Sequence, residues 1–146
     1  MQEKKSVNIL IVEDDPGHRF LIEDNLKKAG IINQIFSAKD GQEALDFLYH
    51  QGAYKDGKKA PTPGLILLDI AMPKVDGFEV LEKLKKDQGL KKIPIIMLTT
   101  TDSQKEIDRS YQLGANNYIT KPVEFKEFQK MIKNLGLFLD IVNFPE

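Results

Sequence analysis

The segment Leu65-Ile-Leu-Leu-Asp69 decides the fold class of this chain of 146 residues. Its apolar part, Leu65 to Leu68, has no polar break, as in a strand that is buried on both faces of a parallel sheet. We also predict strands at four further apolar runs along the chain. These runs are Val7 to Val12, Gln34 to Ser37, Ile93 to Leu98 and Asn117 to Thr120.

Apolar residues between and after these strands recur every three or four positions, which is the spacing of one helix face. The five predicted faces comprise Leu21, Ile22, Leu26 and Ala29; Ala44, Leu45 and Leu48; Phe78, Leu81 and Leu84; Ile107 and Tyr111; and Phe125, Phe128, Ile132, Leu135 and Leu139. Strand and helix alternate five times, which predicts an α/β fold: a doubly wound, five-stranded parallel sheet with helices on both faces. The polar segment from about residue 50 to 63 is expected to be a surface loop.

The composition excludes several classes of function. Lysine and arginine number 21 against 22 for aspartate and glutamate, so the net charge of −1 offers no bulk attraction for nucleic acid or for an anionic membrane. The chain has no cysteine, which excludes disulfides, thiolate metal sites and a cysteine nucleophile. Its apolar runs are too short to cross a bilayer, and its start lacks the apolar stretch of a secretory signal. We therefore predict a cytoplasmic protein.

Three acidic or hydroxyl side chains have a structural explanation at helix starts. Asp15, followed by Pro16, is typical of an N-cap with proline at the first helical position. Asp40 and Ser103 each precede a glutamate by three residues, which is the spacing of a capping box. These residues are therefore assigned to helix capping and not to chemistry.

Other polar residues follow the predicted strands at the point where each strand ends. Glu13 and Asp14 end the first strand, Asp69 the third, Thr99 the fourth and Lys121 the fifth. Because the carboxyl ends of parallel strands lie at one edge of the sheet, we expect these five side chains to converge on one cleft.

This set of side chains suits phosphoryl transfer at a hard metal ion. Three clustered carboxylates repel one another and need a cation, and oxygen ligands without histidine or cysteine favour Mg²⁺ or a similar ion. We expect Asp14 and Asp69 to hold the metal, with Glu13 helping directly or through water. Asp69 would then attack phosphorus to form an aspartyl phosphate. Thr99 and Lys121 would stabilise the transferred group electrostatically.

Several segments resemble the receiver domains of bacterial response regulators. They are Ile9-Leu-Ile-Val-Glu-Asp-Asp15; Leu67-Leu-Asp-Ile-Ala-Met-Pro73 with Asp76-Gly77; Ile93-Pro-Ile-Ile-Met-Leu-Thr99; and Gly114-Ala115 with Tyr118-Ile-Thr-Lys-Pro122. The resemblance implies a flavodoxin-like sheet of order 2-1-3-4-5. It also implies one receiver domain over residues 1–146, with a core of about 7–140 and no output domain.

The resemblance assigns roles to the matching positions. Asp69 matches the phospho-acceptor, Glu13 and Asp14 match the acidic pair, and the backbone carbonyl of Ala71 matches a further ligand of Mg²⁺, for which Mn²⁺ can substitute. Thr99 and Tyr118 match the pair that rearranges on phosphorylation, and Lys121 matches the family's lysine. Lys121-Pro122 matches a cis peptide, and Thr101 matches a position near the site that, with Ala71, tunes dephosphorylation.

The implied function is a phospho-accepting switch in a two-component pathway and not an enzyme. A sensor histidine kinase or a histidine phosphotransfer protein would be the donor. The segment of about 50–63 resembles that of stand-alone regulators associated with bacterial phytochromes. Extra apolar residues in the last helix, such as Met131 and Phe138, point to a homodimer through the surface of the fourth helix, fifth strand and fifth helix.

Two alternatives remain open at this point. A phosphohydrolase of the haloacid-dehalogenase type also uses an aspartyl phosphate, but it has a second aspartate two residues after the nucleophile, where this chain has Ala71. A degenerate receiver that acts only as a scaffold would not need all five polar positions to be filled.

Overall fold

A computed structural model describes residues 8–28, 34–56, 59–72, 74–100 and 103–121, together with 126 and 130. Its strands are β1 (Ile9–Val12), β2 (Ile35–Ala38), β3 (Leu65–Asp69), β4 (Ile95–Thr99) and β5 (Asn117–Thr120). Its helices are α1 (Pro16–Lys28), α2 (Gly41–Tyr49), α3 (Gly77–Lys86) and α4 (Gln104–Gln112), with a 3₁₀ turn, η1 (Gly52–Tyr54). The predicted last helix, around 125–139, lies outside the described residues.

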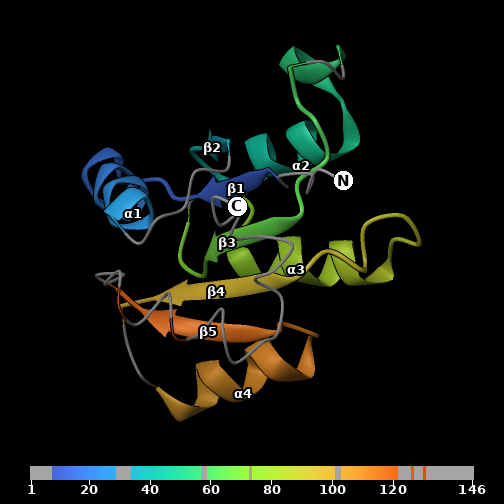
Figure 1. Ribbon diagram of the computed structural model, residues 1–146. Helices are drawn as coiled ribbons and strands as arrows, with labels where there is room; N and C mark the ends of the chain where they lie inside the picture. The colour runs from blue at the N-terminus through green and yellow to red at the C-terminus, as the bar shows by residue number, and fades with distance from the viewer. Residues whose placement is uncertain are drawn as a thin grey trace, which may run out of the picture.

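The five strands form one parallel sheet in the order β2-β1-β3-β4-β5, which confirms the predicted fold class and strand order (Figure 1). Asp69 pairs with Leu98, and Thr99 pairs with Thr120. These registers place the last residues of β3, β4 and β5 along the same edge of the sheet. The polar residues that end the strands therefore meet at that edge, as the sequence predicts.

The two faces of the sheet take alternate residues of each strand. On one face, residues such as Leu10, Ile66 and Met97 belong to the cluster that α2 and α3 complete. Figure 1 shows α2 and α3 together on one side of the sheet, with α1 set apart from them. The intervening residues of the strands, such as Ile11, are also fully buried, and so is Leu26 of α1. Burial on both faces explains the unbroken apolar strands.

Three strands begin later than predicted. β1 begins at Ile9 and not at Val7. β4 begins at Ile95 and not at Ile93, because Pro94 has no N–H to contribute to the sheet. Its carbonyl still accepts a hydrogen bond of 3.0 Å from the backbone N–H of Ile66. β2 runs one residue later than predicted and ends at Ala38, which is fully buried.

The helix starts follow the predicted caps in two cases of three. The side chain of Asp15 accepts a hydrogen bond of 3.0 Å from the backbone N–H of His18, and Asp40 accepts one of 2.7 Å from that of Glu43. The predicted capping box at Ser103 is wrong, because no side-chain cap bond forms at that residue. Asp76, at the start of α3, makes a complete capping box that the sequence reasoning did not identify.

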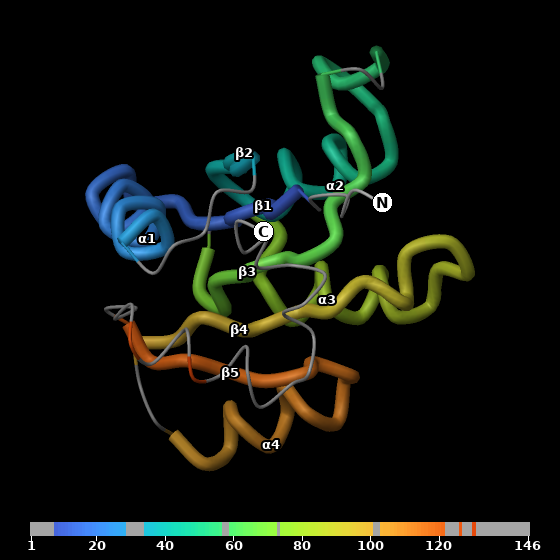
Figure 2. Tube along the Cα trace, viewed as in Figure 1, coloured from blue at the N-terminus to red at the C-terminus, as the bar shows by residue number. Residues whose placement is uncertain are grey.

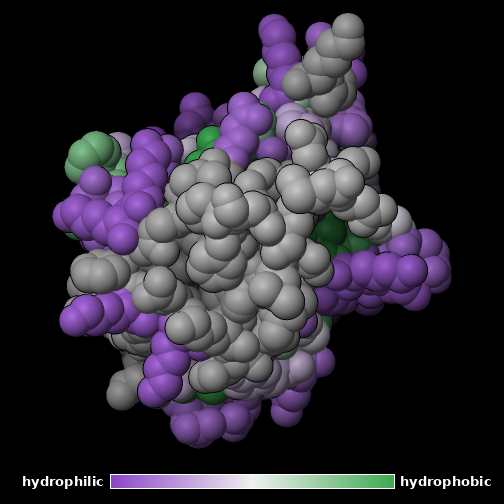
Figure 3. Space-filling view, viewed as in Figure 1, coloured by the Kyte–Doolittle hydropathy of each residue, from purple (hydrophilic) through white to green (hydrophobic). Residues whose placement is uncertain are grey.

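Two predicted core residues are exposed. Leu21 is 48% exposed and Tyr111 is 45% exposed, because each lies next to the buried stripe of its helix and not on it. A green patch over α1 in Figure 3 marks the apolar surface on that side of the molecule, where Phe20 is 67% exposed.

The segment between α2 and β3 projects away from the sheet (Figure 2), as expected for a surface loop. It is nevertheless attached to α2. Ala60 is fully buried and its carbonyl lies 2.7 Å from Nε2 of His50, while the Tyr54 hydroxyl donates a 2.7 Å hydrogen bond to Glu43. None of the helices that the structure describes is both long and apolar enough to cross a membrane.

Candidate functional site

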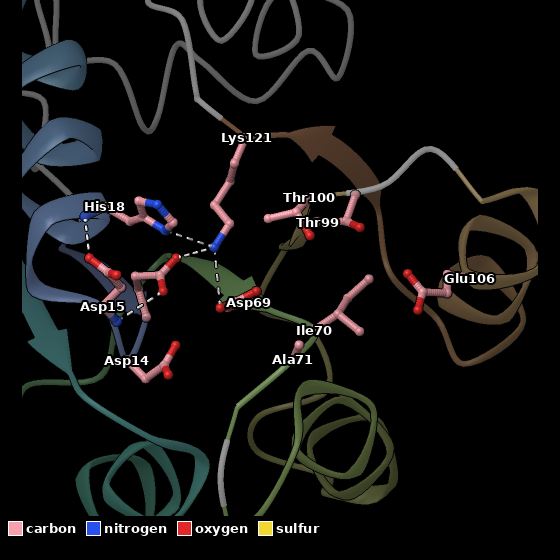
Figure 4. Close-up of a pocket in the computed structure, with 11 residues that line it drawn as sticks. Asp14, Asp15, His18, Asp69, Ile70, Ala71, Thr99, Thr100, Glu106 and Lys121 are labelled. Carbon is pink, nitrogen blue, oxygen red and sulfur yellow. Dashed lines mark hydrogen bonds and ion pairs between the residues drawn. The ribbon is translucent and has the colours of Figure 1, made fainter.

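A cavity of ≈ 250 Å³ opens at the carboxyl edge of the sheet. It contains every one of the five polar residues predicted there, and Ala71 as well. Its lining comprises Glu13, Asp14, Asp15, His18, Asp69, Ile70, Ala71, Thr99, Thr100, Glu106 and Lys121 (Figure 4). The residues come from β1, β3, β4, β5 and the segments that follow them, so only the folded sheet brings them together.

Lys121 is the centre of the polar contacts in this cavity. Its Nζ donates a 2.6 Å hydrogen bond to Oε1 of Glu13 and a 3.3 Å hydrogen bond to Oδ2 of Asp69. Figure 4 shows the lysine side chain reaching from the end of β5 toward Asp69. The three side chains are between 1% and 7% exposed. The backbone holds the lysine in place, because its N–H donates a 2.7 Å hydrogen bond to the carbonyl of Thr99 on β4.

The pairing with Lys121 keeps Glu13 ionised. Burial by itself would raise the pKa of Glu13, but the hydrogen bonds from Lys121 and from the backbone N–H of Asp15 lower the pKa below its ordinary value. Burial would likewise lower the pKa of Lys121, whereas its hydrogen bond to Glu13 and the charge of Asp69 raise that pKa. The two groups therefore form an ion pair at neutral pH.

The pKa values of the other two acids, Asp69 and Asp14, are raised and not lowered. Burial, followed by the negative charge of Glu13, raises the pKa of Asp69 to about 7, although Lys121 opposes this shift. Partial loss of solvent and the hydrogen bond with Glu13 raise the pKa of Asp14 as well, although its side chain remains exposed. One lysine thus does not compensate three carboxylates, and the cluster retains a site for a further cation.

The donor set fits a hard divalent cation. One carboxylate oxygen each from Glu13, Asp14 and Asp69 lies within 4.8 Å of the others, so a single ion can contact all three side chains. Glu13 and Asp69 are buried, whereas Asp14 is exposed and leaves one side open to solvent. Oxygen ligands with room for water and phosphate oxygens are what Mg²⁺ requires.

Glycine holds the segment after β3 against the end of that strand. The backbone N–H of Gly77, the first residue of α3, donates a 2.9 Å hydrogen bond to the carbonyl of Ile70. A Cβ atom at Gly77 would overlap the carbonyl oxygen of Asp69 and lie 2.8 Å from Cα of Ile70. Only glycine permits this approach, which turns the chain so that Ala71 faces the cavity.

Sequence reasoning did not place five further residues at the cavity, which are Asp15, His18, Ile70, Thr100 and Glu106. His18 is exposed, and its Nδ1 lies 3.4 Å from Nζ of Lys121. Its place in the first turn of α1, directly after the Asp15 cap, was the available signal. That turn begins at the end of β1 and must face the same edge of the sheet.

Two of the predicted site residues cannot be placed, and one lies away from the cavity. Thr101 and Pro122, with its expected cis peptide, lie outside the described residues. Tyr118 does not line the cavity. It is half-buried on β5 and packs edge-on against Tyr111 of α4, with 6.1 Å between the ring centroids.

The comparison with known families decides to which family the chain belongs. Residues 9–133 match the family described as the response regulator receiver domain. The chain belongs to this family. Among the relatives of this receiver domain, response regulator Rcp1 of Synechocystis sp. is 38% identical over 138 residues, which span 94% of this chain and 92% of that protein.

Solved structures of receiver domains agree with this assignment. The bacteriophytochrome response regulator AtBRR is 42% identical, with a TM-score of 0.82 over 92% of this chain and 95% of that chain. The phosphorylated cyanobacterial phytochrome response regulator RcpA is 35% identical, with a TM-score of 0.76 over 92% of this chain and 94% of that chain. The Mn²⁺-bound form of Rcp1 is 38% identical, with a TM-score of 0.75 over 96% of this chain and 99% of that chain.

The receiver family defines the type of protein. Receiver domains of two-component response regulators are phosphorylated on an aspartate and bind Mg²⁺. They act as signalling switches rather than as enzymes. Neither the phosphohydrolase nor the degenerate scaffold is favoured by the relatives or by the donor set of the cavity.

Proposed function

We propose that Asp69 is the phospho-acceptor of this receiver domain, and that Glu13, Asp14, Asp69 and the backbone carbonyl of Ala71 hold its Mg²⁺. The observation that supports this most directly is the arrangement around Lys121. Its ammonium group contacts Asp69 within 3.3 Å, inside a cavity where three carboxylate oxygens lie within 4.8 Å of one another.

Each side chain then has one task in phosphoryl transfer. A carboxylate oxygen of Asp69 attacks phosphorus; the new oxygen–phosphorus bond forms as the bond from phosphorus to the donor histidine breaks, and the imidazole leaves. Lys121 would pair with a phosphoryl oxygen, and the hydroxyl of Thr99, at the end of β4, would donate to another. The bound Mg²⁺ supplies positive charge that neutralises the carboxylates and the phosphoryl oxygens.

The switch would use Thr99 and Tyr118. Phosphorylation adds about 1.5 to 2 negative charges at Asp69. We expect the Thr99 hydroxyl to move toward the new oxygens and Tyr118 to turn into the space that it leaves. Both residues belong to neighbouring strands, β4 and β5, and Tyr118 is only half-buried. This would be a shift between two packings of one fold.

The partners follow from the same assignment. We propose that a sensor histidine kinase or a histidine phosphotransfer protein supplies the phosphoryl group, and the phytochrome regulators among the relatives favour a phytochrome kinase as that donor. The homodimer through the surface of α4, β5 and the last helix stays a prediction, because that helix lies outside the described residues. The cytoplasmic location and the single receiver unit of about 7–140 also stay predictions.

Labelling with a small phosphodonor tests the acceptor. Acetyl phosphate with Mg²⁺ should phosphorylate the wild-type protein, and Asp69→Asn should take up no label. Asp108→Asn, the same change on the exposed face of α4, should label normally. Asp14→Asn should bind Mg²⁺ weakly and label slowly. Normal labelling of the Asp69→Asn variant would overturn the assignment of the acceptor.

A further inference from the structure

The loop between β3 and α3, which the structure describes at residues 70–72 and 74–76, links the proposed acceptor and metal site to another helix. Ala71 lies at one end of this loop and lines the cavity. At the other end, Val75 packs against Gly41, the first residue of α2. A Cβ atom at Gly41 would overlap the carbonyl oxygen of Val75 and would lie 2.8 Å from the carbonyl carbon and 2.9 Å from Cβ of the same residue. The first turn of α2 therefore touches the backbone of the loop directly.

This contact leaves the loop little freedom. Gly77 holds its C-terminal end against Asp69 and Ile70 through a close approach of the two backbones and a 2.9 Å hydrogen bond. Directly before Val75, Lys74 adopts a φ of 66°, which a residue with a side chain seldom adopts unless its surroundings impose it. The loop is thus held at two places, and Ala71 lies on the same short segment.

Charge contributes less than packing. Nζ of Lys74 lies 3.8 Å from Oδ2 of Asp40, the N-cap of α2. The Lys74 side chain is 68% exposed, so solvent screens this ion pair. Oδ1 of Asp40 is already engaged in the cap, where it accepts a hydrogen bond from Glu43. The close backbone approach at Gly41 is therefore the feature that sets the path of the loop.

We propose that Gly41 is a positioning residue for the metal site: its missing side chain lets the β3–α3 loop rest on α2, and this support presents the Ala71 carbonyl to the cation. The inference rests on the proposed function, in which that carbonyl is a ligand. Gly41 does not touch the cavity, so its effect reaches the metal only through the path of the loop.

Mg²⁺ binding to the full-length, unphosphorylated protein, measured by isothermal titration calorimetry, tests the inference. Gly41→Ala should raise the dissociation constant by about tenfold or more, as loss of an outer support does at other metal sites. Helix propensity alone predicts that Gly41→Ala stabilises the protein, because alanine is a better helix former than glycine. Propensity therefore gives no reason for weaker Mg²⁺ binding. Gly89→Ala is the matched control: a Cβ there would meet only a flexible side chain, Oδ1 of Asp87, at 3.4 Å.

The outcomes separate this inference from the proposed function. If the wild-type protein binds Mg²⁺ and Asp14→Asn does not, the metal site stands. A folded Gly41→Ala protein with wild-type affinity would then overturn the role of Gly41 alone. Wild-type affinity in Asp14→Asn would instead overturn the metal site itself.

A second pair of variants applies if Gly41→Ala does not fold, as judged by circular dichroism. Lys74→Pro restricts φ to about −65° and so excludes the observed loop path, whereas Lys74→Gly allows it. Weak Mg²⁺ binding in Lys74→Pro with normal binding in Lys74→Gly would support the proposal. Normal binding in Lys74→Pro would refute it, because the path of the loop would then have no effect on the metal.

Discussion

Replacing Asp69 by asparagine should stabilise the metal-free protein, and it should do so more at high pH than at low pH. The Asp69 side chain is 5% exposed, and its pKa rises from the ordinary 3.8 to about 7 in the folded protein. A pKa difference of this size corresponds to about 4 kcal/mol by which the ionised carboxylate destabilises the fold. Asparagine has nearly the same shape and carries no charge at any of these pH values.

The direction of the pH dependence follows from the proton balance. Between pH 3.8 and about 7 the folded protein keeps the proton on Asp69, whereas the unfolded chain has lost it. The free energy of unfolding therefore falls as the pH rises through this window. Below the window Asp69 has almost no effect on it, and above the window it is lower by the whole penalty for the buried charge. The asparagine variant has no such contribution. Its advantage over the wild-type protein should grow by about 2 to 3 kcal/mol from about pH 5 to about pH 8.

Urea denaturation in EDTA at several pH values measures this advantage. Asparagine also loses contacts with Lys121, and this loss changes the difference in the free energy of unfolding between the two proteins by a nearly constant amount. The change of that difference with pH therefore reports the ionisation of Asp69. Asp108→Asn, an exposed substitution of the same type, is the control. An advantage that stays constant across the pH range would refute the reasoning. Adding Mg²⁺ should stabilise the wild-type protein more than the variant, because the variant lacks one carboxylate ligand.

Lys121→Met should destabilise the metal-free protein by about 3 kcal/mol in urea denaturation, because it leaves the buried carboxylates of Glu13 and Asp69 without their cation. Saturating Mg²⁺ should recover part of the lost stability. Equal stability of the variant and the wild-type protein in EDTA would contradict this prediction. Phe47 is 2% exposed, and its ring packs at an angle against Phe36 and edge-on against Tyr54. Phe47→Ala should therefore destabilise the protein by about 3 to 5 kcal/mol. Phe20→Ala, at a side chain that is 67% exposed, should change the free energy of unfolding by no more than about 0.5 kcal/mol. Similar losses in Phe47→Ala and Phe20→Ala would show that burial does not decide the cost.

Local patterns predicted the parts of the fold that depend on neighbouring residues. An unbroken apolar run such as Leu65 to Leu68 is typical of a strand buried on both faces, and Asp15 before Pro16 is typical of a helix start. The predictions were wrong where a position satisfied a local rule that the surrounding structure did not use. Leu21 is an apolar residue next to the buried stripe of its helix, and Ser103 has capping-box spacing without the cap bond.

The sequence by itself determined which chemistry this protein can carry: three carboxylates, a hydroxyl and an ammonium at strand ends, in a chain without cysteine, suit a divalent cation and a phosphoryl group. Only the tertiary structure decided their geometry. The pairing of β1 with β3, of β3 with β4 and of β4 with β5 brings Nζ of Lys121 within 2.6 Å of Oε1 of Glu13, more than a hundred positions earlier in the chain. The same packing places His18 at the cavity and rests the loop after Asp69 on Gly41. Such contacts join residues that are far apart in the chain, and local periodicity and spacing carry no information about them.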